Sequence, residues 1–559
     1  MPIAQKQYPA RFTPRGLVDA FDSTDKFPGA CVKLKDLVFD QSNPEIMVSR
    51  PGVGNAVTSF SGFPSPGFVS VHVTIGSVTY GMIATATNAG KDEPFAWDNA
   101  ASAFIAITGV TNVNSPTSPS TSGAWTPPTM AAIGSKIIVT HPGFVGGATK
   151  FGVIDLAIPS APVWSATDTA GNALPSVPTA VQNFSNRAYY ACSNTVAYSD
   201  VLDPLTRTSG TQALTVGDQA HLTALSGLPI QTTSSGITAA LIIWKDFQVW
   251  QVTGDAATPG GSTLALNFMS LTVGTSSPRS IAQSPLGIYF SSNGGPYNID
   301  QFGILRPHTN SIQVAEPDIQ APWVNATTPS RIASAYSGTI YRVCMDTIIL
   351  GESVTNDYWF DEHKRRWTGP QSFPYDCASQ YGKGMILSSM LAPGKLFFSE
   401  LVPSLASTYL DNGVQMSSTL QSATFPKTGH MVGKQVVEST IELASGGSTA
   451  SFQLTGLDDQ GNTLNSCDVQ ILPTGGLWGS VIWGAFKWAS SINIPATYTV
   501  PWTAPLVFKK MAILVTSTAQ TALAFGTFFA RYQETGYTNT LGVPPQETLN
   551  TEDDLPILT

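Results

Sequence analysis

Few side chains of this 559-residue chain stand at spacings typical of catalysis. The adjacent carboxylates Asp361 and Glu362 have the chemistry of a glycosidase acid–base pair. Adjacent residues of a strand point to opposite faces, so these two cannot flank one bond, and we expect a turn there instead. The chain has no phosphate-binding glycine loop, no Gly-x-Ser-x-Gly elbow and no His-Glu-x-x-His segment. The sequence therefore predicts no catalytic residue and a protein that is not an enzyme.

Residue types that ligate metals are present, but their spacing favours structural roles. Asp458, Asp459 and Asn462 offer oxygen ligands for Ca²⁺ without the register of an EF-hand loop, so a hairpin turn is the stronger interpretation. The histidines and cysteines are too scattered for a ligand motif, and we expect no metal, no cofactor, and buried thiols rather than disulfides. These residues are His72, His141, His221, His308, His363 and His430, with Cys31, Cys192, Cys344, Cys377 and Cys467.

The charge of the chain argues against a protein that grips nucleic acid. Its net charge is −9 and only 12% of its residues are charged, so it lacks the basic footprint that such binding needs. Arg279, Arg306 and the trio Lys364-Arg365-Arg366 are candidates for contacts with a polar partner, and equally for solvent-facing turns. No apolar run approaches the roughly 18 residues that span a bilayer, and the N-terminus lacks an apolar signal segment. We expect synthesis in a reducing cytosol and no membrane span.

The elements that would position any site are strands and turns. Leu241–Trp244 is continuously apolar, and Phe247, Val249 and Val252 then fall nearly on period two. Lys245-Asp246 stands where a tight turn would join the two parts. The segment therefore predicts a β-hairpin.

Further hairpins follow the same logic. Leu286–Phe290 and Pro296–Ile299 flank Asn293-Gly294-Gly295, and Asn-Gly is the strongest short hairpin signal. Asn186–Cys192 with residues 194–204 forms another predicted hairpin. Such units recur about every 40 to 50 residues, the spacing of propeller blades.

We therefore predict an all-β protein, an irregular β-propeller with a C-terminal β-sandwich-like module. The 49 glycines and 40 prolines fit many short strands joined by turns. The expected divisions are an N-terminal arm over residues 1–50, the propeller over 51–425, the C-terminal β module over 426–535 and a flexible acidic tail over 536–559. The arm is as well suited to completing the edge of the propeller as to clipping onto a neighbouring subunit.

The order of the motifs resembles that of the tail nozzle (tubular tail) proteins of short-tailed bacteriophages. In that family an apolar strand, a Lys-Asp turn and an aromatic strand closing on Gly-Asp are followed by Gly-x-x-x-Pro-Arg-Ser, here residues 274–280. An apolar-aromatic strand closing on Ser-x-x-Gly comes next, here at residues 291–294. Upstream, Asn186-Arg187 begins an aromatic strand, and Ser199-Asp200-x-x-Asp203-Pro204 follows. The resemblance covers roughly residues 10 to 535.

This resemblance implies a structural virion protein, made in the host cytoplasm and located in the tail. It implies a ring, typically a hexamer, that docks on the portal through the tail adaptor, or head-to-tail connector, and carries tail fibres or spikes. DNA would pass through the lumen during genome ejection without specific binding. Acidic side chains in the lumen would repel phosphates and lower friction, a hypothesis that rests on net charge.

A second hypothesis is a carbohydrate-binding or receptor-binding propeller on the virion surface. Exposed Trp125 and Trp367 would then stack on sugars. A protein of this kind should be a monomer or trimer that binds glycan, whereas a nozzle should need a partner ring. A soluble enzyme ranks third, because the sequence lacks a catalytic constellation.

Overall fold

The computed structural model divides into two compact units, one formed by residues 17–20 and 50–416 and the other by residues 1–16, 21–49 and 417–559. The residues that it describes are 7–18, 29–41, 43–54, 66–85, 91–111, 113–114, 128–144, 146–232, 236–254, 264–308, 319, 321–349, 352–389, 392, 394–403, 407–425, 432–445, 449–471, 495–518 and 523–536. Trp125, His430 and the predicted tail over 536–559 therefore lie outside the described residues, apart from Gly536 itself. The same holds for Val481–Phe486, a segment that the sequence predicts as a strand.

Within the described residues of the larger unit, seven antiparallel sheets follow one another along the chain. The first three comprise β6 (Pro66–Ile75), β7 (Val78–Thr85), β8 (Lys91–Asp98), β9 (Ala103–Ile105) and β10 (Val113–Asn114); β11 (Thr129–Ile133), β12 (Lys136–Thr140), β13 (Phe151–Asp155) and β14 (Val163–Thr167); and β16 (Ala180–Phe184), β17 (Arg187–Cys192), β18 (Thr195–Tyr198) and β20 (Ala213–Thr215).

The later sheets have the same up-and-down order. They comprise β21 (Ala224–Thr232), β22 (Gly236–Trp244), β23 (Val249–Thr253) and β24 (Ala265–Ser270); β25 (Ala282–Ser284), β26 (Gly287–Ser292), β27 (Gly295–Asp300) and β28 (Leu305–Pro307); β29 (Ala333–Ser337), β30 (Ile340–Ile349), β31 (Glu352–Asp361) and β32 (Arg366–Gln371); and β33 (Cys377–Tyr381), β34 (Gly384–Ser388) and β35 (Phe397–Glu400). Two small pairs, β15 (Ala170–Gly171) with β19 (Thr206–Arg207) and β36 (Leu410–Asp411) with β37 (Val414–Gln415), lie in the connections.

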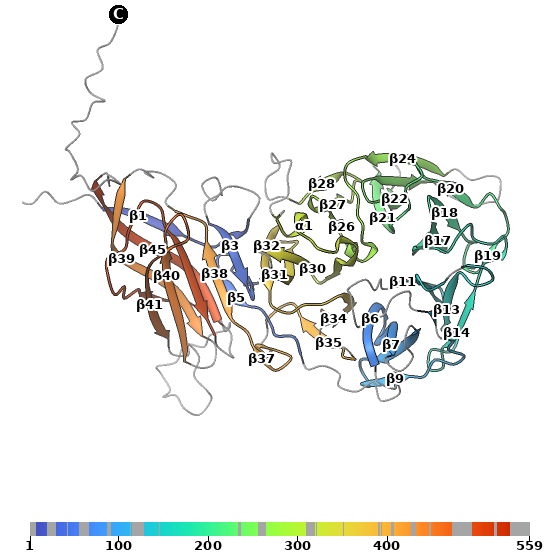
Figure 1. Ribbon diagram of the computed structural model, residues 1–559, viewed down its shortest axis with the longest axis horizontal. Coiled ribbons are helices and arrows are strands. Elements are labelled where there is room, and N and C mark those ends of the chain that lie inside the picture. Colours follow the sequence, from blue (N-terminus) through green and yellow to red (C-terminus); the bar gives the residue numbers. More distant parts are fainter. Residues whose placement is uncertain are drawn as a thin grey trace, which may run out of the picture. The chain divides into compact units, whose positions relative to one another are not determined.

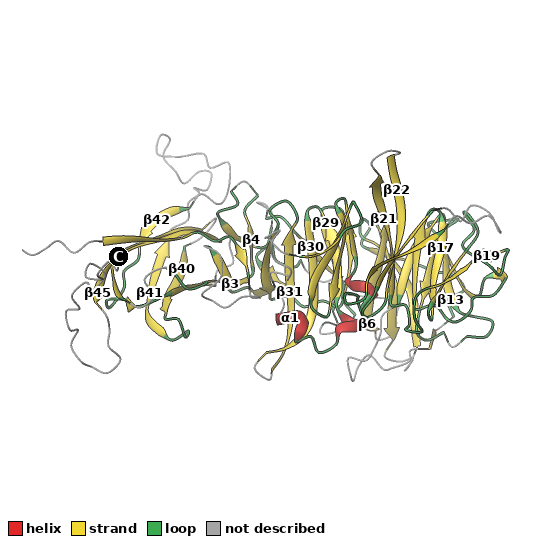
Figure 2. Cartoon of the chain, turned by 90° about the horizontal axis from the view of Figure 1, so that it is seen from above, coloured by secondary structure: helices red, strands yellow, loops and turns green. Residues whose placement is uncertain are grey.

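These sheets are the blades of a propeller, and they surround a common centre in Figure 1. Neighbouring sheets contact one another through or beside their first strands, and β33 of the last sheet contacts β6 of the first, so the ring closes. The predicted all-β propeller fold is confirmed. Figure 2 shows strands along nearly all of the described chain; its helical parts are α1 (Ala321–Val324) and the short 3₁₀ turns η1 (Pro278–Ser280) and η2 (Pro329–Arg331).

The continuous apolar run before Lys245 is explained by burial on both faces of one blade. Leu241 and Ile243 pack with Tyr189 of the preceding sheet. Ile242 packs on the other side with Phe290 of the following sheet. Alternate residues of one strand thus serve two blade interfaces, which a strand with a solvated face cannot do. The predicted hairpin is confirmed, with one correction: Phe247 lies in the turn and is 60% exposed.

The Lys-Asp turn and the segment after β24 hold neighbouring blades together. Lys245 is 1% exposed, and its Nζ donates to the carbonyl and the carboxylate of Asp218, at 2.8 and 2.6 Å. Gly274 approaches the Lys245 carbonyl so closely that a Cβ would lie 2.2 Å from it. The Ser277 hydroxyl donates to the Ile332 carbonyl at 2.6 Å. The residues of these motifs therefore have structural roles at blade junctions.

The smaller unit is built of two antiparallel sheets. One contains β1 (Gln7–Phe12), β4 (Leu37–Phe39), β5 (Met47–Ser49), β39 (Gly433–Ser445), β42 (Ala496–Thr499), β43 (Val507–Phe508) and β45 (Leu523–Gly536); the other contains β3 (Ala30–Lys35), β38 (Ser418–Ser422), β40 (Ala450–Leu457), β41 (Thr463–Ile471) and β44 (Ala512–Ser517). Phe452 of β40 and Phe525 of β45 meet between them, with ring centroids 5.2 Å apart. The predicted sandwich-like module is present.

Strands β1, β3, β4 and β5, all within the predicted N-terminal arm, lie in the sheets of the smaller unit and do not form a separate arm. Strand β1 pairs along its length with β45, from Gln7 opposite Gln533 to Phe12 opposite Phe528. A strand that gains a full ladder of hydrogen bonds is part of the sheet, so this segment belongs to the C-terminal module. The segment Val507–Val515, whose sequence predicts a single strand, is divided between β43 and β44.

Candidate functional site

The first strands of the blades line a cavity of about 430 Å³ on the propeller axis. Each of the described sheets of the ring contributes residues to its wall. A volume of this size is typical of pockets for small molecules. The cavity is therefore the candidate functional site of the propeller unit.

Polar contacts between first strands fix part of this wall. The hydroxyls of Thr74 and Ser379 lie 2.7 Å apart and join β6 to β33. Gln283 donates from Nε2 to the Ser226 hydroxyl at 2.9 Å and to the Gly227 carbonyl at 2.7 Å. The wall is thus pre-formed by the blades that it joins.

Arg279 is the basic residue of this wall. Its Nη1 donates to the Asp376 carbonyl at 2.9 Å and contacts Cys377 Sγ at 3.6 Å, and its Nη2 donates to the Ser330 carbonyl at 3.2 Å. Its own carbonyl accepts from the Ser334 hydroxyl at 3.2 Å. These contacts hold the guanidinium in one place at the cavity, rather than on an outward turn.

His72 lines the same cavity and remains neutral. Burial, followed by the nearby charge of Arg279, lowers the pKa of His72 to about 3. Among the described residues its Nε2 has no hydrogen-bond partner. The neutral ring leaves Arg279 as the cation of the wall.

Behind the wall, Glu362 gathers three hydroxyl groups. Tyr336, which lines the cavity, donates to Oε2 at 2.5 Å, while Tyr289 and Ser284 each donate to Oε1 at 2.7 Å. Burial and the bond to Glu362 raise the pKa of Tyr336 and Tyr289 well above the ordinary range. The predicted turn at Asp361-Glu362 is confirmed, since the Lys364 N–H donates to Asp361 at 3.0 Å. Sequence reasoning missed the tyrosine partners of Glu362, because they lie on other strands.

The segment that precedes the first blade pairs with the last sheet and so closes the ring. Val53 forms an antiparallel bridge with Ser399 of β35. The Gly54 N–H donates to the Phe398 carbonyl at 2.7 Å, and the Asn412 N–H donates to the Val53 carbonyl at 3.0 Å. The last sheet is thus extended at β35 by the segment that precedes the first blade, and this pairing closes the ring.

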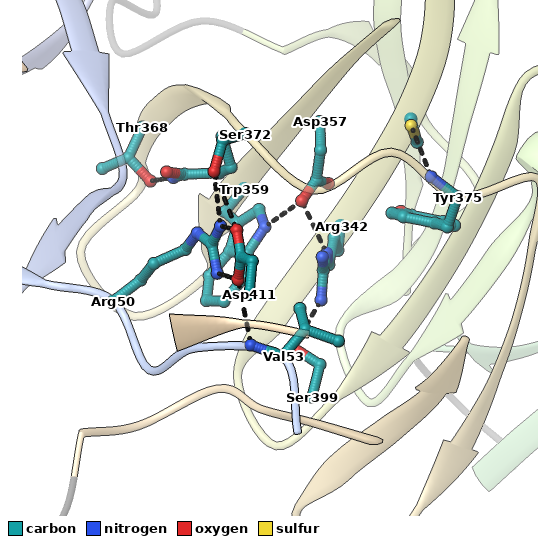
Figure 3. A network of polar contacts seen from close by, with 12 residues as sticks. Arg50, Val53, Arg342, Asp357, Trp359, Thr368, Ser372, Tyr375, Ser399 and Asp411 are labelled. Atoms are coloured by element: carbon teal, nitrogen blue, oxygen red, sulfur yellow. Dashed lines mark hydrogen bonds and ion pairs between the residues drawn. The ribbon is translucent and has the colours of Figure 1, made fainter. Parts of the chain in front are cut away.

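Arg50 fixes this closure (Figure 3). Its Nη1 donates to Asp411 Oδ1 at 2.9 Å, and its Nη2 contacts Oδ2 of the same carboxylate and donates to Ser372 at 3.0 Å. Asp411 also accepts the Val53 N–H at 3.0 Å. A bidentate guanidinium–carboxylate pair is the strongest geometry for such a contact.

A second pair lies next to the first (Figure 3). Arg342 donates from Nε to Asp357 Oδ2 at 2.8 Å and from Nη1 to Ser399 at 2.7 Å. Trp359 donates to the same oxygen of Asp357 at 2.7 Å, and its ring lies 4.7 Å from the guanidinium carbon. The ring of Tyr375 also contacts Arg342, with its centroid 4.9 Å from the guanidinium carbon. Both pairs are structural, because they are enclosed by the fold.

The remaining predicted residues have structural places. His141 donates from Nε2 to Asp92 at 2.7 Å, since its Nδ1 accepts the Gly143 N–H at 2.8 Å. His308 is buried against Phe360 and Trp367, and burial lowers its pKa to about 3. His221 and His363 lie on exposed segments, and all five cysteine side chains are buried.

Three further predictions are settled by local contacts. Trp367 is 0% exposed, so its predicted role in stacking on sugars is wrong. Asp458 accepts the N–H groups of Gln460 and Asn462, which confirms the hairpin turn. Arg306 lies 54% exposed beside Asp300, and Lys364 lies 3.4 Å from Asp361. In the described part of the chain no cluster of metal-ligating side chains occurs, and no helix has the length and apolar character of a membrane span.

Comparison with known proteins gives the fold alone. No protein-family model matches the chain, and no curated protein matches it. Similar solved structures include the WD40 β-propeller domain of Doa1, which is 8% identical in sequence. The match covers 59% of this chain and 93% of that chain, with a TM-score of 0.33. A puromycin hydrolase is 12% identical, with 66% of this chain and 62% of that chain covered and a TM-score of 0.37. Saccharomyces cerevisiae Sqt1 is 8% identical, with 64% of this chain and 100% of that chain covered and a TM-score of 0.32. These weak likenesses concern the arrangement of strands and carry no function.

Proposed function

We propose that this chain is the nozzle subunit of a short bacteriophage tail, a structural virion protein that acts as part of a ring rather than as a catalyst. The observation that carries the proposal is the order of the sequence motifs from Asn186-Arg187 to the Ser-x-x-Gly turn at residues 291–294. These motifs fall on the blade junctions of the propeller unit, where Lys245, Gly274 and Ser277 make the contacts described above. A stiff wall of sheets suits a conduit that must keep its shape.

In this proposal DNA passes through the central lumen of the ring of subunits, and not along the axis of any one propeller. A cavity of about 430 Å³ has the size of a small-molecule pocket. It is too small to admit duplex DNA, whose major groove alone is about 12 Å wide. The lumen must therefore be enclosed by several copies, for which a hexamer is the expected number. The ring would dock on the tail adaptor and carry fibres or spikes at its side.

A rigid apolar tip on the fifth sheet supports contact with a second copy of this chain. Asp300 Oδ1 accepts the N–H groups of Phe302 and Ile304, each at 2.9 Å, which fixes the turn between β27 and β28. Phe302 is 56% exposed, Ile304 46% and the adjacent Leu286 46%. Pre-organised apolar side chains of this kind are typical of interface anchors. We assign this tip to the neighbouring subunit of the ring.

The test is native mass spectrometry and negative-stain imaging of the purified chain, alone and mixed with the adaptor ring of its source virion. We expect a six-fold tube with an axial channel, alone or on the adaptor. Phe302→Ser/Ile304→Ser should abolish the tube, whereas Val414→Ser, at a 67% exposed position elsewhere in the unit, should not. A chain that stays monomeric with the adaptor would overturn the proposal.

A further inference from the structure

The axial cavity of the propeller has chemistry that a mere wall does not need. Its polar groups come from different blades: Arg279 precedes β25, Gln283 lies on β25, Gln182 on β16 and Gln380 on β33. Residues that converge from separate blades on one cavity are typical of a ligand site.

The cavity provides one fixed cation. Three acceptors, the carbonyls of Asp376 and Ser330 and the sulfur of Cys377, engage Arg279. A guanidinium has more N–H donors than these three acceptors use, so it retains capacity for a carboxylate. No Asp or Glu is among the described residues that line the cavity, and the Glu362 carboxylate behind the wall is covered by the Tyr336 hydroxyl that donates to it.

The carboxamides add neutral hydrogen-bonding groups. Gln283 uses its Nε2 on Ser226 and Gly227, which leaves its Oε1 without a partner among the described residues. Gln182 donates from Nε2 to the Asn183 carbonyl at 3.0 Å, so its Oε1 is available in the same way. Tyr336 gives its proton to Glu362, and its oxygen remains an acceptor. These oxygens accept hydrogen bonds from hydroxyl groups.

We propose that the axial cavity binds a sugar acid, a single saccharide unit that carries a carboxylate. Arg279 holds the carboxylate, and Gln283, Gln182 and Tyr336 accept from the sugar hydroxyls. The cavity volume suits one such unit. This binding site lies outside the nozzle function proposed above and does not depend on ring assembly.

The test is isothermal titration of the full chain with D-glucuronate, with D-glucose, acetate and inorganic phosphate in parallel. Glucuronate should bind at least tenfold more tightly than glucose, which lacks the carboxylate, and than acetate, which lacks the hydroxyls. Equal binding of phosphate or acetate would show a general anion site and overturn the proposal, and so would a failure of glucuronate to bind.

Variants locate the site. Arg279→Gln should weaken glucuronate at least tenfold and leave glucose unchanged, whereas Arg306→Gln, at an outward arginine, should change neither. Since Arg279 also joins several segments, Ala378→Phe is the second variant: Ala378 lines the cavity, is partly exposed, and a larger side chain there fills the space. Thermal unfolding confirms that each variant is folded. Unchanged glucuronate binding in Ala378→Phe would place the sugar elsewhere and refute the site.

Discussion

Two arginine–aspartate pairs at the ring closure have the same chemistry and opposite electrostatics. Both arginine side chains, Arg50 and Arg342, are 0% exposed, but Asp357 is also 0% exposed whereas Asp411 is 11% exposed. Burial raises the pKa of Asp357 to about 6, against the opposing effects of Arg342 and the Trp359 N–H. Burial also acts on Asp411, yet Arg50, the Val53 N–H and Ser372 together lower its pKa. The number of donors and the access of water decide which effect prevails.

The two pairs have different structural roles. Asp411 accepts from the Arg50 side chain and from the Val53 N–H, so its charge holds the segment that precedes the first blade. Asp357 is held within one sheet: it lies on β31 opposite Cys344, and it accepts from Arg342, which lies on the neighbouring β30 opposite Trp359. The ionised form of Asp357 depends mainly on Arg342, with smaller contributions from the Trp359 N–H and the charge of Arg50.

The largest effect is expected from Arg342→Met. This change leaves the Asp357 carboxylate buried without its cation and removes the bond to Ser399, and we expect a loss of about 3–5 kcal/mol in the free energy of unfolding. Urea denaturation at pH 7 measures it. The double variant Arg342→Met/Asp357→Leu should recover much of the loss, because an apolar pair needs no solvation. No recovery would mean that the charge is not the cause.

Asp411→Asn should have a smaller and more local effect. Loss of the charged acceptor costs about 1.5–3 kcal/mol, since Arg50 keeps its bonds to Ser372 and to the Pro51 carbonyl. Hydrogen exchange should accelerate at residues 52–54, whose amides are fixed by the closure. Glu438→Gln, which removes an exposed ion pair of the other unit, is the matched control and should change neither quantity. An equal increase in the rate of hydrogen exchange in all blades would contradict a local effect at the ring closure.

The pH dependence of stability should separate the pairs by sign. Between about pH 4 and 6 folded Asp357 retains a proton that the unfolded chain has lost, so its contribution is present at low pH and falls as the pH rises. The advantage of the wild type over Asp357→Asn should therefore shrink across this window, by at most about 1.4 kcal/mol per pH unit. Asp411 has a lowered pKa, so its contribution is present above the ordinary aspartate pKa and is lost as the pH falls below it. Denaturation of both variants from pH 3 to 7 provides the slopes, and slopes of equal sign would refute the assignment.

The fold was predictable where local patterns decide it. The apolar run Leu241–Trp244 needs two covered faces, and Asn293-Gly294 favours a tight hairpin turn, so blades follow from short segments alone. Phe247 was misplaced because alternation does not reveal where a turn lifts a side chain into solvent. The burial of Trp367 follows from aromatic neighbours on other strands, such as Tyr341 and Phe360.

The closure and the axial cavity were beyond the reach of sequence reasoning for one physical reason. Val53 pairs with Ser399, and Arg50 with Asp411, across the whole sequence of the intervening blades. The cavity wall likewise combines single residues of each first strand, such as Gln182 and Gln283, which have no distinctive spacing. Contacts of this kind depend on the geometry of the whole ring and not on any local preference.

The smallest effect is expected from the loss of the Ser372 hydroxyl. Ser372 accepts from Arg50 Nη2 at 3.0 Å and donates to Asp411 Oδ2 at 2.8 Å, so it belongs to the Asp411 pair and not to the Asp357 pair. Its side chain stands at an exposed position, where water replaces a lost hydroxyl, and Ser372→Ala should cost only about 0.5–1 kcal/mol. Ser399→Ala removes a hydroxyl of the same size from the enclosed Arg342, and the unsatisfied Nη1 should then cost about 1–3 kcal/mol. Urea denaturation of the two variants side by side tests whether enclosure, rather than the hydrogen bond itself, sets the strength of each pair; equal losses would show that it does not.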